Sequence, residues 1–572
     1  MLAMAPSISS LTHCWGSTDA AFRRDAWRSG LIAAFHLAAL ALMALSEVAI
    51  VPKAVFLLSW GMLNFFRIAL LRRPAVSAAL SLVMIVALIL LSQFKYNIIS
   101  MTANFLDVWI IDNYTVRFLL MTIPGLTLKL AIAGALTIAF LGLLWRLDRF
   151  RVRLQTAVIG LVACLTGIAV LSIAFPQEDW EGYFGDSYVS KFSRSGVATI
   201  SALMMHGYME SDAVVADRLK MLPDATCRPI GKPPHIILVH DESSFDIRVA
   251  PGIKVPAGYG PHFRSFDGRE RRFIAEGAGG PSWYSEYNVL SGLSARSFGR
   301  FAYYVTRIAA GRVERGLPTA LRRCGYRTFS IYPVLGAFMS AKSFQTTTGV
   351  QKFFDQSSLG TDRVEPDQFY YNAARRMIER ERGNGPMFLF VYLAANHWPW
   401  NYRWRPDLMT EWKALGNKPE IDEYLRRQSM SFRDYAELLD HLKGDFPHEP
   451  FLLVRYGDHQ PDFATTIIEP SLDEAAIAKR LMAYDPRYFT TYYAIDTVNF
   501  KPNNLTSALD MIEGPYLPLV VLEAAGLPLD SSFAEQKKIL ERCKGLFYTC
   551  AGGAEVRRFN RLLIDASLIK GL

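Results

Sequence analysis

The chain has 572 residues, of which 51% are hydrophobic and 20% charged, and its formal net charge is +9. The length excludes a single small domain, and the hydrophobic fraction is typical of a membrane protein. Much of the positive charge is arginine that flanks apolar segments, so it does not indicate a nucleic-acid partner. Almost all the long apolar runs lie before Phe175, and the remainder has the composition of a soluble domain. We therefore expect a protein that is integral to a membrane.

Five apolar runs approach the roughly 20 residues that a helix needs to cross a bilayer. They lie near residues 30–50, 54–71, 77–94, 126–145 and 156–175. Because the first run is long and others follow it, we do not expect a cleavable signal peptide. The predicted organisation is a cytoplasmic N-terminus (1–28), a five-helix transmembrane domain (29–175), a linker that packs at the outer membrane surface (176–233) and an extracytoplasmic domain (234–572).

Clusters of arginine predict the orientation. They precede the first run, close the second and separate the fourth from the fifth, at Arg23, Arg24, Arg28, Arg67, Arg72, Arg73, Arg146, Arg149, Arg151 and Arg153. With the N-terminus inside, all three clusters face the cytoplasm, as positively charged loops do. An odd number of crossings then places everything after Phe175 outside. We expect a multi-pass protein of the bacterial plasma (inner) membrane with a periplasmic domain.

Polar side chains in or beside the apolar runs can mark a transport pathway. Glu47 and Lys129 lie near the ends of runs, where we expect them to reach water, and His36 is isolated. These positions disfavour transport. The amphipathic segment 104–113, NFLDVWIIDN, is either a surface helix beside the lipid headgroups or a plain loop.

Four cysteines lie in the part of the chain expected outside, where disulfides form. Cys227, Cys324, Cys543 and Cys550 allow three pairings. Cys543 and Cys550 are close in sequence, so we predict that they pair and leave Cys227 and Cys324 as possible partners.

Three short apolar runs in the second half predict buried strands of a parallel sheet with crossover helices. They are HIILV (235–239), MFLFVYLA (387–394) and FLLVRY (451–456). Weaker candidates for the same sheet are RTFSIY (327–332) and LPLVVL (517–522).

Polar residues follow each of the three strong candidate strands. The sequences are His240-Asp241-Glu242-Ser243, Asn396-His397 and Gly457-Asp458-His459. Ligands bind at the carboxyl ends of strands in open α/β sheets. Carboxylate and imidazole groups suit zinc or manganese. Each motif alone is more often a loop or capping feature, but together they predict a metal site at one edge of the sheet.

The order of these motifs resembles the sulfatase-like branch of the alkaline phosphatase superfamily. Five helices followed by an outer domain are similar to lipoteichoic acid synthases, osmoregulated-glucan phosphoglycerol transferases and phosphoethanolamine transferases. The segment LPTALRRCGYRTFSIYP (317–333) also resembles the helix and strand of that family. The resemblance implies a bundle of five transmembrane helices plus a C-terminal α/β domain of alkaline phosphatase/sulfatase-like type.

The resemblance also implies a nucleophile within GAGGPSWYSEYNVLSGL (277–293). The family spacing, four residues before a Glu that precedes an aromatic residue, selects Ser282. Ser285 and Ser291 are alternatives, as is a glycine-rich turn with incidental serines. A serine hydroxyl needs a base or a metal to become a good nucleophile. Gly279 and Gly280 would let the backbone approach, and a helix beginning at Ser282 would favour anions.

The family's ligands carry over to one divalent metal ion, Mn or Zn. The implied ligands are Glu242, Ser282, Asp458 and His459, and His397 would reach the substrate phosphate. The place of Asp241 is left open, and His240 is either a support behind the ligands or a packed core imidazole.

Two departures from the family bear on the activity. Ser282 is not followed by the x-Pro-x-Arg of formylglycine sulfatases, which argues against an ordinary sulfatase. The stretch PVLGAFMSAKS (333–343) lacks the Asp, Trp and Arg that hold phosphoglycerol in lipoteichoic acid synthases. We expect a transferase that moves a phospholipid headgroup, with phosphoglycerol favoured, from a membrane phospholipid donor to a glycan or glycolipid acceptor. The alternatives are a phosphoethanolamine transferase, a phosphoester or sulfoester hydrolase, and a membrane assembly protein with a degenerate domain.

Overall fold

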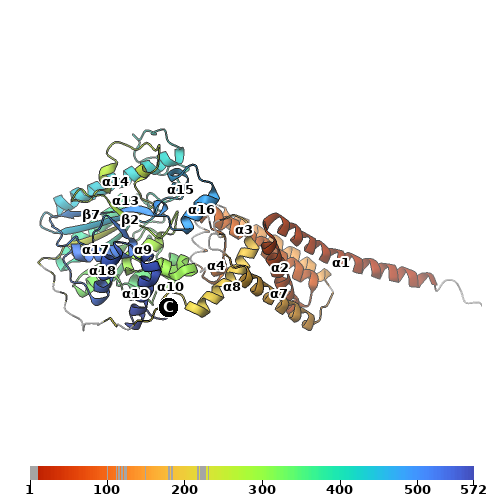
Figure 1. The fold of residues 1–572 in the computed structure, drawn as a ribbon. Helices are drawn as coiled ribbons and strands as arrows, with labels where there is room; N and C mark the ends of the chain where they lie inside the picture. Colours follow the sequence, from red (N-terminus) through yellow and green to blue (C-terminus); the bar gives the residue numbers. More distant parts are fainter. Residues whose placement is uncertain are drawn as a thin grey trace, which may run out of the picture. The chain divides into compact units, whose positions relative to one another are not determined.

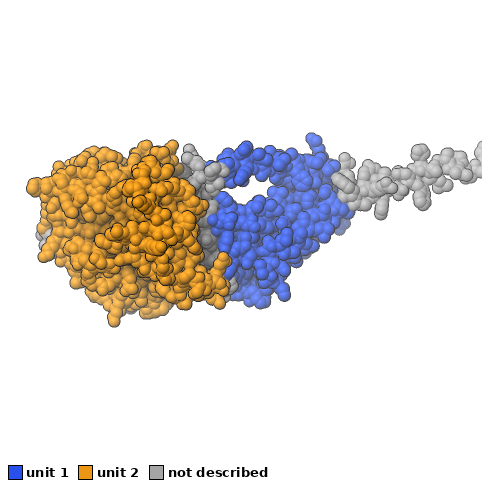
Figure 2. Space-filling model, turned by 90° about the horizontal axis from the view of Figure 1, so that it is seen from above, with its two compact units in different colours: residues 1–202 blue, residues 203–572 orange. Residues whose placement is uncertain are grey.

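The computed structural model of the chain describes residues 11–99, 101–110, 125–148, 150–177, 184–215 and 231–572, with isolated residues between these ranges. Arg149 of the arginine clusters and part of the segment 104–113 lie outside the described residues. The chain forms two compact units, residues 1–202 and 203–572 (Figure 2). Their boundary falls inside the range 176–233 that was predicted as a linker.

Five helices of the first unit are long and apolar enough to cross a membrane. They are α1 (Leu11–Ser46), α2 (Ile50–Leu71), α3 (Pro74–Ile99), α6 (Leu126–Leu147) and α7 (Leu154–Ala174) (Figure 1). Their apolar stretches are Ser29–Ser46, Ile50–Leu71, Pro74–Asn97, Leu126–Leu147 and Leu154–Ala174. The predicted five-helix bundle is confirmed, and the chain is a multi-pass membrane protein with a soluble domain.

Two further helices belong to this unit. The segment 104–113 contains the short helix α4 (Phe105–Ile110), and α8 (Tyr188–His206) follows the last apolar helix. Glu47 accepts hydrogen bonds from the backbone N–H groups of Val189 (3.2 Å) and Ser190 (3.4 Å), which begin α8. The expectation that Glu47 reaches water is wrong, because its carboxylate instead caps N–H groups that have no partner within the helix.

The second unit is built on a mixed eight-stranded sheet with the order β4-β3-β5-β1-β6-β7-β2-β8. The strands are β1 (His235–Asp241), β2 (Arg271–Ile274), β3 (Arg327–Ile331), β4 (Lys352–Phe354), β5 (Met387–Tyr392), β6 (Phe451–Gly457), β7 (Thr490–Val498) and β8 (Met511–Glu513). β4, β3, β5, β1 and β6 are parallel, and β7 runs antiparallel to its neighbours β6 and β2. The three strong candidate strands and RTFSIY are confirmed.

The weaker candidate LPLVVL is not a strand. It lies in the buried helix α17 (Leu517–Ala524), where every residue is buried. A helix that is covered on all sides has the same continuous apolar sequence as a buried strand. The prediction failed because pattern alone does not separate the two.

Helices cover both faces of the sheet. In Figure 1, α13 (Asp367–Glu381) and α14 (Pro419–Asp445) lie on one side of the strands, and α9 (Ser282–Ser291), α17 and α18 (Ser531–Cys543) lie on the other. Side chains of α13 and α14 form one hydrophobic core with β1, β3, β5 and β6. The remaining helices of this unit are α10 (Val305–Ala309), α11 (Leu317–Arg323), α12 (Ala341–Thr347), α15 (Ala464–Ile468), α16 (Glu474–Met482) and α19 (Ala554–Asp565).

Two disulfides join the four cysteines of this unit. Cys543 pairs with Cys550, which confirms the predicted pair, and Cys227 pairs with Cys324.

Candidate active site

The carboxyl ends of β1 and β6 bring the first predicted site residues together. These strands are parallel neighbours, and Asp241 is in register with Gly457. Glu242 and Asp458 follow these residues directly, so both carboxylates lie at the same edge of the sheet. Glu242 is 3% exposed and Asp458 is fully buried. Two buried carboxylates side by side require a compensating positive charge.

The geometry around this pair fits a divalent cation. One ligand atom each from His240, Glu242 and Asp458 lies within 4.8 Å of the other two. Asp458 Oδ2 and His240 Nε2 are 3.2 Å apart, yet neither has a hydrogen-bond partner among the described residues. Unsatisfied buried donor and acceptor atoms are costly, and coordination of an ion removes that cost. The donor set of carboxylate and imidazole suits zinc or manganese.

Ser282 is the first residue of α9, and its hydroxyl meets this cluster. Ser282 Oγ donates to Glu242 Oε2 at 3.3 Å and lies 3.1 Å from His459 Nε2. His459 Nε2 is 3.6 Å from Glu242 Oε1 and 3.4 Å from Asp458 Oδ2. The structure thus brings together all four side chains that were predicted as ligands.

The alternative serines are differently placed. Ser285 Oγ donates to the Asp458 carbonyl oxygen at 2.5 Å, and Ser291 Oγ donates to the Tyr287 carbonyl oxygen at 2.6 Å. Both hydroxyls are occupied by backbone groups. Gly279 has φ +69°, and a Cβ there would lie 3.3 Å from Asp462, so the loop before Ser282 requires a glycine.

The carboxylates of Glu242 and Asp458 have their pKa values shifted in opposite directions. Burial, then the charge of Asp458, raises the pKa of Glu242. Burial also acts to raise the pKa of Asp458, but the charges of His459 and His240 outweigh it and hold that pKa at about 2. The pKa of His459 is raised, since attraction to Asp458 and Glu242 outweighs its burial. A group of this kind is poised to bind positive charge.

A comparison with protein families identifies this part of the chain. Residues 277–496 match the family model described as Sulfatase. Residues 277–496 are therefore a region that matches the Sulfatase family. The resemblance read from the order of the motifs is therefore confirmed, and the match includes Ser282, Asp458 and His459.

Individual proteins similar to the chain include one curated relative. The capsular polysaccharide biosynthesis protein RkpI from Rhizobium meliloti (strain 1021) is 28% identical over 302 residues, which cover 49% of this chain and 52% of RkpI. The chain thus spans about half the length of that relative.

Two solved structures are also similar. The Streptococcus pyogenes phosphoglycerol transferase GacH, in complex with sn-glycerol-1-phosphate, is 16% identical with a TM-score of 0.47, covering 61% of this chain and 89% of GacH. The lipooligosaccharide phosphoethanolamine transferase EptA from Neisseria meningitidis is 12% identical with a TM-score of 0.47, covering 84% of this chain and 96% of EptA.

His397 stands apart from the cluster formed by Glu242, Ser282, Asp458 and His459. It follows β5, is exposed, and its Nδ1 lies 2.6 Å from the Trp398 carbonyl oxygen. Its charge nevertheless acts to lower the pKa of Glu242, against burial and the charge of Asp458. His397 therefore lies near enough to influence the cluster, although no hydrogen bond or ion pair joins the two among the described residues. Trp400 is part of the core, whereas Trp398 is exposed.

The His397 loop is held by a buried arginine that sequence reasoning missed. Arg427, on α14, is 1% exposed and is paired with Glu423 at 2.7 Å. Its guanidinium donates to the carbonyl oxygens of His397 (2.9 Å), Pro399 (2.9 Å) and Tyr402 (3.1 Å). Charged arginines are rarely buried unless they are paired. The clue that the sequence offered was the i,i+4 spacing of Glu423 and Arg427 on α14, which allows such a pair.

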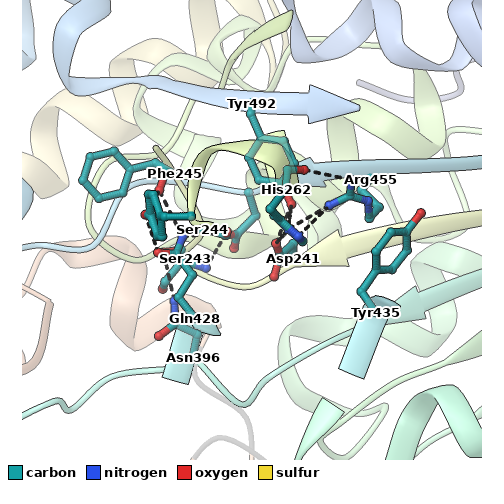
Figure 3. A network of polar contacts seen from close by, with 12 residues as sticks. Asp241, Ser243, Ser244, Phe245, His262, Asn396, Gln428, Tyr435, Arg455 and Tyr492 are labelled. Carbon is teal, nitrogen blue, oxygen red and sulfur yellow. Dashed lines mark hydrogen bonds and ion pairs between the residues drawn. The ribbon is translucent and has the colours of Figure 1, made fainter. Parts of the chain in front are cut away.

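Asp241 turns away from the candidate metal site. Tyr492 donates its hydroxyl to Asp241 Oδ2 at 2.5 Å, and His262 Nε2 lies 3.7 Å from the same oxygen. Arg455 extends this buried network to Asp496 at 3.0 Å, and Figure 3 shows Asp241, His262 and Arg455 pointing toward one another. Successive residues of a strand face opposite sides, which explains why His240 and Asp241 take different partners.

Proposed function

We propose that the protein is a membrane-anchored, metal-dependent transferase that moves a phospholipid headgroup onto a glycan or glycolipid. Phosphoglycerol is the favoured headgroup. The observation that carries the proposal is the position of Ser282 Oγ, 3.3 Å from Glu242 and 3.1 Å from His459 beside a pair of buried carboxylates.

Glu242, Asp458 and His459, with His240 behind them, would hold one divalent ion, Mn or Zn. When bound, such an ion lowers the pKa of a coordinated hydroxyl and neutralises charge on phosphoryl oxygens. Ser282 Oγ then attacks the phosphorus of the donor. The Ser282 Oγ–P bond forms as the hydroxyl proton passes to the solvent, and the P–O bond to diacylglycerol breaks as the diacylglycerol oxygen takes a proton from His397.

The second half of the reaction regenerates the serine. An acceptor hydroxyl attacks the phosphorus of the Ser282 adduct and its proton passes to His397, which gave one up in the first half. The Ser282 Oγ–P bond breaks, Ser282 Oγ takes a proton from the solvent, and the headgroup phosphate is left on the acceptor. The imidazole of His397 would orient the phosphate and supply a proton to the leaving diacylglycerol. The start of α9 at Ser282 favours the negative charge of both steps.

The membrane helices support a lipid donor, because a site on a membrane-anchored domain meets phospholipids directly. We place this domain in the periplasm because the arginine clusters predict that orientation. RkpI is named for capsular polysaccharide biosynthesis, which supports a glycan acceptor.

The choice of phosphoglycerol as the donor headgroup rests on the residues around Ser282. The stretch SWYSEYNVLSGL resembles the phosphoglycerol branch, whereas phosphoethanolamine enzymes carry a Cys-Gly-Thr motif. Residues 333–343, after β3, lack Asp, Trp and Arg, which keeps phosphoethanolamine as the second candidate. A few hydrogen bonds of about 1–3 kcal/mol each set such a preference.

The test uses the full chain in detergent with defined phospholipids. Phosphatidylglycerol with Mn or Zn should yield diacylglycerol, and mass spectrometry should find a phosphoglycerol adduct on Ser282. Chelation with EDTA should stop the release, and the metal should restore it. Diacylglycerol from phosphatidylethanolamine alone would reverse the headgroup choice. Release from neither lipid would contradict the transferase and point to a hydrolase of another ester.

A further inference from the structure

The turn that follows β1 is pressed against the end of β6. Its first residue, Ser243, has φ +49°, a left-handed conformation that is uncommon for a residue with a side chain. The next residue, Ser244, passes so close to β6 that a Cβ on Gly457 would lie 1.7 Å from the Ser244 carbonyl oxygen. The turn therefore requires a glycine at the end of β6, directly before Asp458.

Ser243 is buried, and its backbone and hydroxyl groups all have partners. Its hydroxyl donates to Glu242 Oε1 at 2.8 Å, and its backbone N–H donates to Asp458 Oδ1 at 2.7 Å. Its carbonyl oxygen accepts from the Tyr424 hydroxyl at 2.9 Å and from Asn396 Nδ2 at 3.5 Å (Figure 3). A strained backbone persists where its surroundings fix it from several sides in this way. One residue thus contacts both carboxylates of the candidate metal site.

These contacts decide which oxygen of each carboxylate is left for an ion. Asp458 Oδ1 also accepts from the backbone N–H of His459 at 2.8 Å, whereas Oδ2 has no hydrogen-bond partner among the described residues. Glu242 Oε1 is occupied by the Ser243 hydroxyl, and Oε2 lies 3.3 Å from Ser282 Oγ. Ser243 therefore engages one oxygen of each carboxylate and leaves Glu242 Oε2 and Asp458 Oδ2 available.

The hydroxyl and the backbone of Ser243 have separable roles. Asp458 is held by two backbone N–H groups, which any residue at position 243 would preserve as long as the turn keeps its shape. The carboxylate of Glu242 is a longer side chain, and the hydroxyl of Ser243 is what holds its Oε1. Groups behind metal ligands fix the orientation of those ligands and so contribute to the affinity for the metal.

We infer that Ser243 is a positioning residue that orients Glu242 and Asp458 toward one divalent ion, Mn or Zn. Its hydroxyl acts through Glu242, and its backbone N–H acts through Asp458. The inference rests on the metal site of the proposed function and is independent of the donor and the acceptor.

The test measures metal binding without any lipid. The full chain in detergent is freed of metal with EDTA, dialysed and titrated with Mn²⁺ and with Zn²⁺. Ser243→Ala should weaken binding by about 10- to 100-fold, the effect of removing a group behind a metal ligand. Ser243→Gly lacks the same hydroxyl, so it should weaken binding by a similar factor.

The glycine variant also guards against a loss of fold. Glycine adopts the φ of +49° without strain, so Ser243→Gly should keep the turn even if Ser243→Ala does not. Thermal unfolding of the metal-free proteins shows which variants are folded. Ser244→Ala is the matched control, because this neighbouring buried hydroxyl accepts from Gln428 Nε2 at 3.2 Å instead of contacting a carboxylate of the metal site. It should keep the affinity of the wild type.

The outcomes separate this inference from the proposed transferase. Wild-type affinity in a folded Ser243→Gly, or equal weakening in Ser244→Ala, would overturn the positioning role. A wild type that binds neither ion would overturn the positioning role and the metal-dependent mechanism together. Weaker binding in the Ser243 variants, with no diacylglycerol release by the wild type from either phospholipid, would contradict the transferase while the positioning role stands.

Discussion

Arg427 Nη1 donates a hydrogen bond to the carbonyl oxygen of His397 at 2.9 Å, although the two residues lie on different elements. The other end of the same guanidinium holds Pro399 and Tyr402, and Glu423 fixes the guanidinium from behind. The backbone of an exposed loop is therefore tied to a buried helix. We infer that Arg427 positions the His397 loop, because its guanidinium donates hydrogen bonds to the backbone of that loop.

Arg427→Lys should impair catalysis more than metal binding. Lysine keeps the charge opposite Glu423 but lacks the planar fork that holds three carbonyls. We expect kcat to fall by about 10- to 100-fold, the size of effect that a misplacement of about 1 Å produces. Metal content should stay unchanged. The exposed Arg403→Lys on the same loop serves as control. Parallel loss of metal and activity would show a general collapse of the domain instead.

Ser282→Ala should abolish turnover with little effect on folding, since it deletes one small polar atom. Loss of a nucleophile costs at least about 10³-fold in rate. Ser285→Ala is the matched control three positions along the same helix, and it removes only the hydrogen bond to the Asp458 carbonyl. Diacylglycerol release measures both variants. An active Ser282→Ala together with an inactive Ser285→Ala would mean that the wrong serine was chosen.

Much of the site was predictable because its parts follow continuous apolar strands. β1, β5 and β6 are buried on both faces, so each has a continuous apolar sequence that predicts a strand. The residues that follow these strands meet at one edge of the sheet. Two other strands of the sheet, β2 and β8, are too short to produce a pattern. Arg427 reaches a carbonyl 30 residues away, and no local rule predicts such a contact.

Glu286→Gln should change the pH dependence of stability. Burial raises the pKa of Glu286 to about 7, and its Oε2 has no hydrogen-bond partner within the described residues. The folded state therefore binds the proton more tightly than the unfolded state does. The wild-type protein should lose about 3 kcal/mol of stability from this group as pH rises from about 4.5 to 7.

The glutamine variant carries no charge and should escape that loss. Thermal unfolding in detergent should show that the stability of the variant relative to the wild type increases between pH 5 and pH 8. Glu379→Gln, at an exposed position on α13, is the control, and its difference in stability from the wild type should not change over this pH range. A constant difference for Glu286→Gln as well would contradict the raised pKa.

Reporter fusions should place the second unit, residues 203–572, outside the cytoplasm. The prediction rests on the arginine clusters, since positively charged loops are retained inside. Fusions after Arg73 and after Arg153 should report cytoplasm, and a fusion after Pro176, which follows α7, should report the outside. The paired reporters alkaline phosphatase and green fluorescent protein control each other, because each is active on one side only. A cytoplasmic signal at Pro176 would remove the domain from the outer leaflet, and with it the access to the lipid donor that the mechanism requires.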